Sequence, residues 1–257
     1  MLRRVQREQI VGLSGPRALL MQAAQPVAFA GFFMSTGALD DPYERLRRTA
    51  GVLRLIAFGE RRAADRATAR VRAVHRRVRG TLPGAAGRFP AGTPWAADDP
   101  ELLLWIIATL VDSSLLVYQR YVAALTREER EAYWQDYRVV GRLFGLRDGD
   151  MPATIEEFES YMADMLSSDV LQVSAQARRL ALEIVLRPPV PLQARPLLEL
   201  ANFITIGLLP ETLRRQYGLR WDPVRGLMLR VGAEYTKRVL VPVLPDRVRY
   251  RGRRAAA

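Results

Sequence analysis

The sequence predicts an all-α fold, a single domain of about ten helices spanning residues 1–257. Apolar residues recur every three or four positions through most of the chain, and helix-start signals precede several of these segments. Strand signals are sparse: the best candidate, residues 239–244, contains Pro242, which cannot donate a ladder hydrogen bond. No internal repeat and no clear linker divides the chain.

Helix boundaries follow from capping residues and from Gly and Pro. The predicted helices cover residues 2–12, 17–34, 42–58, 60–79, 101–124, 126–144, 154–167, 174–186, 191–206, 210–217 and 223–240. Four of them begin at recognisable caps, namely Asp41-Pro42, Asp99-Pro100, Thr126 with Glu129, and Thr154 with Glu157. Pro26 is expected to kink the second helix. Residues 81–97 are expected to form a loop or lid, and residues 247–257 a basic frayed tail.

The N-terminal region has some features of a signal peptide. Three arginines precede an apolar stretch, residues 18–34, that contains small residues. Against that interpretation, Arg17 precedes the stretch directly, Gln22 and Gln25 lie inside it, and it is short for a membrane span. We therefore expect a buried helix, a cytoplasmic protein and no membrane span.

The contents of Cys and His limit the metal and cofactor sites that the chain can build. The sequence has no Cys and a single His, His75. The lack of Cys excludes thiolate-bound haem, covalent c-type haem, protein-bound iron–sulfur clusters and Cys-based zinc sites. A single His excludes multi-histidine metal sites. A metal held by one protein nitrogen, with a macrocycle supplying other ligands, is compatible with this composition.

The net charge of +12 is of the size found in nucleic-acid-binding proteins. However, Lys237 is the only Lys among 39 basic residues, and such an Arg bias also arises from GC-rich coding. The charge is uneven as well: residues 1–90 hold 17 basic and 6 acidic residues, 91–160 hold 6 and 13, and 161–257 hold 16 and 8. We therefore do not expect nucleic acid as a partner.

His75 lies on a predominantly apolar face of the predicted helix 60–79. That face is formed by the residues Ala64, Ala67, Val71, Val74 and Val78. A core histidine is the structural interpretation, and a metal ligand is the functional one. A buried imidazole needs partners for both nitrogens, and a bound iron would provide one. The neighbouring Arg72, Arg76 and Arg79 disfavour the imidazolium form, so the ring is expected to be neutral, as ligation requires.

Two further polar features lie in predicted helices. Arg45 and Thr49 are four residues apart, so they are either part of a solvated helix face or the polar wall of a pocket. Asp112 lies in the apolar helix 101–124, where an unpaired carboxylate is costly. We expect Asp112 to pair with an Arg and to tie two helices together, in preference to a catalytic role.

Six segments in this order resemble the MpaB-type oxygenase family, which includes the rubber-cleaving latex-clearing proteins. They are GPRALLMQAAQP (15–26), DPYERLRRT (41–49), VRAVHRRVRG (71–80), DPELLLWIIATLVDS (99–113), PATIEEFESYMADML (152–166) and GLLPETLRRQYGLRW (207–221). The resemblance covers about residues 7–225. It implies a globin-like all-α domain that holds a haem b.

The resemblance also implies roles for individual residues. His75 matches the axial iron ligand, and Arg45 and Thr49 match the distal catalytic pair. Arg48 stands where rubber-cleaving relatives have a Lys that can occupy the distal iron position. We assign His75 to the metal, and His75, Arg45, Arg48 and Arg79 to cofactor binding.

The chain departs from the family at several positions. Gln25 and Ile107 stand where many relatives have His, and residues 22–39 offer no clear acid to match the base proposed for rubber oxygenases. Cleavage of polyisoprene is therefore not expected here.

Three functions are compatible with these features. The first is a haem b-dependent oxygenase that uses dioxygen to oxidise a small apolar substrate, a class that includes unsaturated compounds. The second is a haem carrier or sensor without turnover, and the third is a basic helical module that binds anionic lipid or nucleic acid. The sequence lacks the motifs of the common hydrolases, because it contains neither Gly-x-Ser-x-Gly nor a phosphate-binding loop. The sequence does not specify the oligomeric state.

Overall fold

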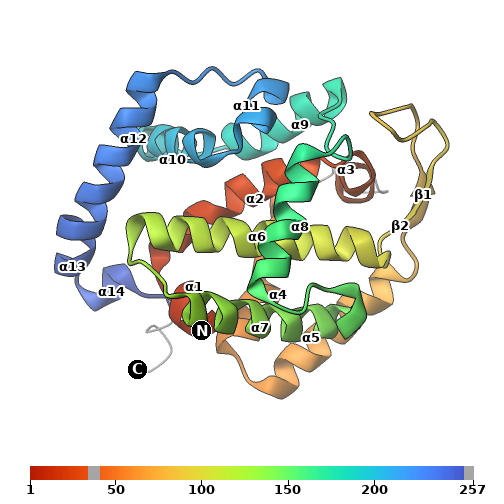
Figure 1. Ribbon diagram of the computed structural model, residues 1–257, viewed down its shortest axis with the longest axis horizontal. Coiled ribbons are helices and arrows are strands. Elements are labelled where there is room, and N and C mark those ends of the chain that lie inside the picture. The colour runs from red at the N-terminus through yellow and green to blue at the C-terminus, as the bar shows by residue number, and fades with distance from the viewer. Residues whose placement is uncertain (34–40, 252–257) are drawn as a thin grey trace.

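The computed structural model describes residues 1–33 and 41–251 and confirms the all-α prediction (Figure 1). Its N-terminal half contains α1 (Leu2–Gln6), the 3-10 turn η1 (Gln9–Leu13), α2 (Ser14–Ala23), α3 (Pro26–Phe33), α4 (Pro42–Phe58), α5 (Arg61–His75), β1 (Arg79–Thr81), β2 (Pro94–Ala96), α6 (Pro100–Tyr121) and α7 (Arg127–Phe144). The C-terminal half contains η2 (Asp148–Asp150), α8 (Ile155–Ser167), α9 (Ala175–Leu186), η3 (Leu192–Ala194), α10 (Arg195–Leu208), α11 (Glu211–Tyr217), α12 (Pro223–Tyr235), the π-helical turn η4 (Thr236–Leu240), α13 (Val241–Val243) and α14 (Asp246–Arg249).

Helix α6 is the centre of the core. It is apolar on most sides, and α2, α7 and α12 pack around it (Figure 1). Among the described residues it is the one helix long and apolar enough to cross a membrane, but 67% of its most apolar window is buried inside the protein. Such burial is the pattern of a core helix and not of a membrane span.

The predicted caps are confirmed. The side chains of Asp41 and Asp99 accept hydrogen bonds from backbone N–H groups in the first turns of α4 and α6. Thr126 and Glu129 form a reciprocal capping box at α7. Thr154 caps α8 in the expected way, although its partner Glu157 accepts from the backbone N–H of Ala153 and not from that of Thr154.

Several boundaries differ from the prediction. Pro26 does not kink one long helix but begins a separate one, α3, at the first-turn position that proline favours. Residues 2–12 divide into α1 and a 3-10 turn. Residues 239–243 of the candidate strand are helical, in η4 and α13. The predicted frayed tail is ordered as far as residue 251, because Arg249 binds the buried carboxylate of Glu8 through two nitrogens. Residues 252–257 of that tail and residues 34–40 lie outside the described residues.

Most of the predicted loop 81–97 is the connection of a two-stranded hairpin, because residues 82–93 join β1 to β2. Strand β1 pairs with β2 in antiparallel register, with Gly80 opposite Trp95. A Cβ atom at Gly80 would lie 2.6 Å from the Trp95 ring, so this close approach requires glycine. Trp95 is buried with Val27 and Ala30, which attaches the hairpin to α3.

Candidate functional site

His75 is the last residue of α5, which packs against α4 and α7. The predicted helix 60–79 thus ends four residues early, and Arg79 belongs to β1. The predicted apolar face is also displaced, because Val74 is 58% exposed while Ala67 and Thr68 are buried. The buried face passes through Ala67 and Val71 to His75, so the imidazole occupies the inner face at the end of the helix.

The His75 side chain is half-buried and makes no hydrogen bond to any residue that the structure describes. Its Nδ1 atom is buried without a partner. Burial lowers the pKa of the imidazole below its usual value, the Arg45 guanidinium lowers it further, and the Asp98 carboxylate acts against both. The ring is therefore neutral near pH 7 and has nitrogen lone-pair capacity that the protein itself does not use.

The hairpin brings Asp98 near His75. The backbone N–H of Ala97 donates to the carbonyl of Val78 at 2.9 Å, which joins the residues after α5 to those before α6. Arg79 lies 3.6 Å from the Asp98 carboxylate and donates to the carbonyl of Arg76. Asp98 was not among the predicted site residues. The sequence did contain a signal for it. Of the two adjacent aspartates before α6, one is enough to cap the helix, and that one is Asp99, so the carboxylate of Asp98 is left for another role.

Among the predicted site residues on α4, Arg45 is oriented differently from the other two. Arg45 is half-buried, and burial lowers the pKa of its guanidinium, which stays charged at neutral pH. Arg48 is exposed and pairs with Glu44 at 2.9 Å. Thr49 is exposed, and its hydroxyl donates to the carbonyl of Arg45 in its own helix. The structure therefore groups His75 with Arg45, Asp98 and Arg79, and leaves Arg48 and Thr49 on the outer surface of α4.

The predicted tie to Asp112 is confirmed, with Arg17 as its partner. The Arg17 side chain is buried, with Nη1 2.6 Å from the Asp112 carboxylate and from the Ser113 hydroxyl. Its Nε donates to the carbonyl of Leu208 at 2.8 Å. One guanidinium thereby joins α2, α6 and α10, and this is a structural role.

The two positions where relatives carry His also have structural roles here. The Gln25 side chain accepts from the backbone N–H of Ala28 and so caps α3. Ile107 is buried in the main core. Within residues 1–33 and 41–251, no cluster of three or more acidic or His side chains is able to hold a metal ion. In the described region, His75 is accordingly the candidate for a nitrogen ligand.

Comparison with known proteins identifies the family. Residues 2–238 match the family described as "ER-bound oxygenase mpaB/B'/Rubber oxygenase, catalytic domain", a longer region than the resemblance in the sequence motifs indicated. Searches of curated proteins and of solved structures gave no match. Because the family match covers nearly all of the chain, the protein belongs to the MpaB/rubber-oxygenase family of oxygenase catalytic domains.

Proposed function

We propose that this protein is a haem b-dependent oxygenase that acts on a small apolar substrate, with His75 as the protein ligand to iron. Family membership implies an oxygenase. The observation that supports the finer proposal is the neutral, half-buried His75 ring, whose Nδ1 is buried without a partner. A bound group that takes up an imidazole nitrogen would remove part of the cost of leaving that ring without hydrogen bonds.

The residues around His75 fit a porphyrin in their charge. When bound, haem supplies the redox-active iron on which dioxygen chemistry takes place. The protein supplies a neutral imidazole, which needs no proton release before ligation. Arg45 supplies a half-buried positive charge beside that ring, suited to a propionate carboxylate. Arg79 is the second candidate for a propionate, since its present contact with Asp98 is long, at 3.6 Å. Arg48 is a weaker candidate, because Glu44 already neutralises it.

The apolar surroundings support the substrate class. A cluster formed by Val27, Ala30, Leu82 and Trp95 joins α3 to the hairpin, and Val78, three residues after His75, packs against it. These side chains pack against one another and give the residues beside His75 an apolar environment, which favours an apolar ligand over a polar one. We also propose that dioxygen is the second substrate, that the protein is cytoplasmic and that it has no nucleic-acid partner.

Haem binding can be tested on the purified protein, produced with haem supply. We expect a Soret absorption band that shifts on reduction and addition of carbon monoxide. His75→Gly should lose the band, and added imidazole should restore it, because the free ligand occupies the vacated position. Val74→Gly is the matched control: it places the same residue one position earlier, where the side chain is exposed, and should keep the band. A colourless wild type that ignores added haemin would overturn the proposal.

A haem carrier or sensor without turnover is the second candidate. It is favoured by the position of Thr49, whose hydroxyl is bonded to its own helix and which therefore offers no free donor in the arrangement described. Dioxygen consumption with unsaturated apolar compounds distinguishes the two candidates. An oxygenase consumes dioxygen in proportion to substrate, whereas a carrier shows the Soret band and no consumption.

A further inference from the structure

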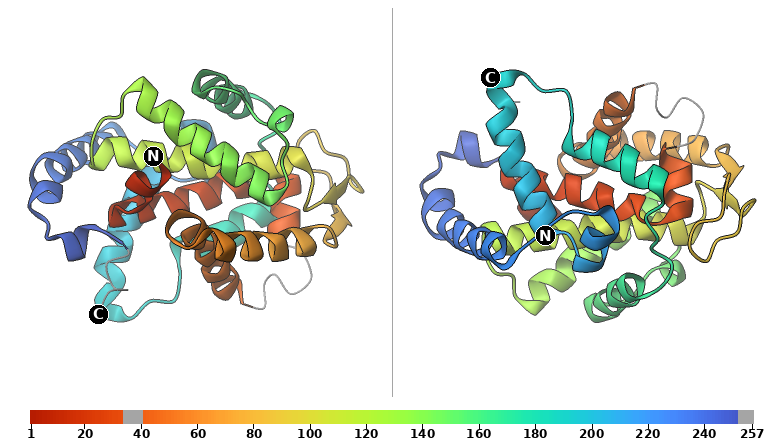
Figure 2. Two further views of the ribbon diagram at one scale, coloured as in Figure 1. Left: turned by 90° about the horizontal axis from the view of Figure 1, so that it is seen from below. Right: turned by 90° about the horizontal axis from the view of Figure 1, so that it is seen from above.

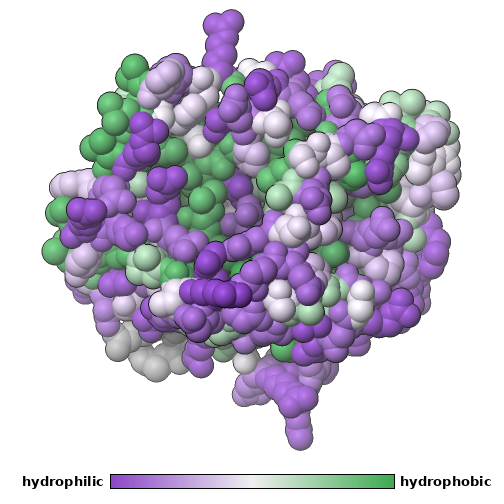
Figure 3. All heavy atoms as spheres, viewed as in Figure 1, coloured by the Kyte–Doolittle hydropathy of each residue, from purple (hydrophilic) through white to green (hydrophobic). Residues whose placement is uncertain are grey.

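The outer face of α12 is apolar and exposed. Val224, Leu227, Met228, Val231 and Tyr235 are between 53% and 66% exposed, and we call these five residues the outer stripe. Figure 3 shows apolar side chains gathered along the edge of the molecule where α12 runs. The stripe follows helical spacing, so it forms one continuous surface. Contiguous exposed apolar surfaces of this kind mark interaction sites.

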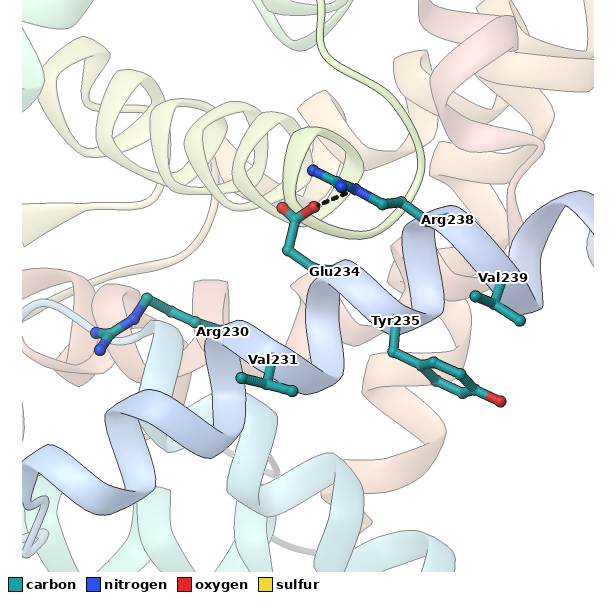
Figure 4. A pocket seen from close by; sticks show the side chains of 6 residues that line it. All are labelled: Arg230, Val231, Glu234, Tyr235, Arg238 and Val239. Carbon is teal, nitrogen blue, oxygen red and sulfur yellow. Dashed lines mark ion pairs between the residues drawn. The ribbon is translucent and has the colours of Figure 1, made fainter.

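The opposite face of α12 already attaches the helix to the protein. Leu229 and Ala233 are buried against α6 and α10. Directly after the helix, Lys237 of η4 donates to the carbonyl of Gln119 at 3.0 Å. The outer stripe is therefore not needed to hold α12 in place. In Figure 4, Val231, Tyr235 and Val239 point to one side of the helix, away from the ion pair between Glu234 and Arg238.

Positive charge borders the outer stripe. Residues 220–240, which comprise α12, η4 and the segment before them, contain five basic and two acidic residues, a net charge of +3. At the N-terminal end of α12, a groove of about 600 Å³ is lined by four arginines, Arg214, Arg215, Arg220 and Arg230, and by two carboxylates, Glu211 and Asp222. Arg220 and Arg230 make no ion pair with any described residue, so both guanidinium groups are available to an anion.

We propose that α12 docks this protein on an anionic lipid surface, with the outer stripe inserted at the acyl–headgroup boundary. Arg220 and Arg230 then bind lipid phosphates, while the exposed Tyr235 occupies the interface that amphipathic aromatic rings favour. A second copy of the chain fits less well, because its outer stripe carries the same positive border and the two would repel. An anionic bilayer supplies both the apolar layer and the opposite charge.

The proposal is tested by co-sedimentation of the full chain with vesicles. We expect binding to vesicles of phosphatidylcholine and phosphatidylserine, weaker binding to phosphatidylcholine alone, and loss of binding as salt rises. Met228→Glu with Val231→Glu should weaken binding by about tenfold or more, because two charged side chains replace inserted apolar ones. Arg220→Gln with Arg230→Gln should weaken it by roughly tenfold and reduce the salt dependence.

Two controls keep the outcome interpretable. Val139→Glu on α7 changes an apolar side chain that is 47% exposed outside this surface, and it should bind vesicles as the wild type does. Circular dichroism shows whether each variant is folded. Failure of the wild type to bind anionic vesicles would overturn the proposal, as would equal loss in Val139→Glu. A dimer in analytical ultracentrifugation that Met228→Glu with Val231→Glu dissociates would assign the surface to a second copy instead.

Discussion

The His75 region and helix α12 lie at opposite ends of the molecule, and their side chains are mismatched to their surroundings in opposite ways. The hairpin that follows His75 and helix α12 are at opposite ends of the long axis in Figures 1 and 2. At one end a polar imidazole is half-buried without a partner, and at the other apolar side chains are exposed. A buried imidazole nitrogen without a partner costs free energy, and a contiguous exposed apolar surface is typical of an interaction site. These two mismatches are the observations behind the two proposals.

The C-terminal region, which contains α12, is attached to the N-terminal segment by the ion pair between Arg249 and Glu8. Arg249 holds the Glu8 carboxylate, which is 2% exposed, with two nitrogens at 3.0 Å. Arg249→Ala leaves that carboxylate buried and unpaired, and should lower the free energy of unfolding by about 3 kcal/mol. Urea denaturation measures this loss. The Soret band should persist in the folded variant, because the His75 region lies at the other end.

Arg247→Ala is the matched control for the ion pair between Arg249 and Glu8. Arg247 is on the same short helix and exposed, and it makes no ion pair with a described residue. Its substitution should change the free energy of unfolding by less than about 0.5 kcal/mol. Equal losses in the two variants would show that the Glu8 contact has no special part in stability.

Variants of the two ends can be combined to test whether the ends act independently. Met228→Glu with Val231→Glu should reduce vesicle binding by about tenfold and leave the Soret band unchanged. His75→Gly should do the reverse. In the combined variant the two effects should add as free energies, since distant sites without shared partners are independent. Loss of haem in the α12 variant would mean that the two regions are coupled.

The sequence predicts helices better at their starts than at their ends. Asp41, Asp99, Thr126 and Thr154 cap the expected helices, because a cap is a contact between neighbours in the chain. The end of α5 was misplaced, since it depends on pairing of residues 79–81 with residues 94–96 and on the fit of Trp95 over Gly80. The ordered C-terminal segment was missed for the same reason, because Arg249 and Glu8 are 241 residues apart.

The sequence identifies the central residue of the candidate site but not how the side chains around it are arranged. His75 follows from composition, as it is the one imidazole in the chain, and its inward orientation follows from the face that it shares with Ala67. The helical pattern could not show that Thr49 turns outward while Arg45 stays half-buried, because α4 packs through tertiary contacts. It also could not show which of the two apolar faces of α12 would be exposed, since both have helical spacing.

The smallest expected effect concerns the charge state of His75, and it is measurable because no other imidazole overlaps its signal. In the haem-free protein, NMR titration should give a pKa below the usual His value, because burial and Arg45 both disfavour the imidazolium. Asp98→Asn should lower this pKa further, and Arg45→Gln should raise it. Each change should correspond to less than about a tenfold shift in the protonation equilibrium.

The same depressed pKa links folding to pH with a definite sign. The unfolded chain takes up a proton at His75 more readily than the folded one, so the folded state loses stability as the pH falls below the unfolded pKa. The loss stops growing once the pH is below the folded pKa as well. His75→Gln should remove this acid-side contribution, and Arg45→Gln should shift its lower limit to higher pH. A His75 pKa at or above its usual value would contradict the description of the ring as buried and neutral. It would also remove the observation that supports His75 as an iron ligand.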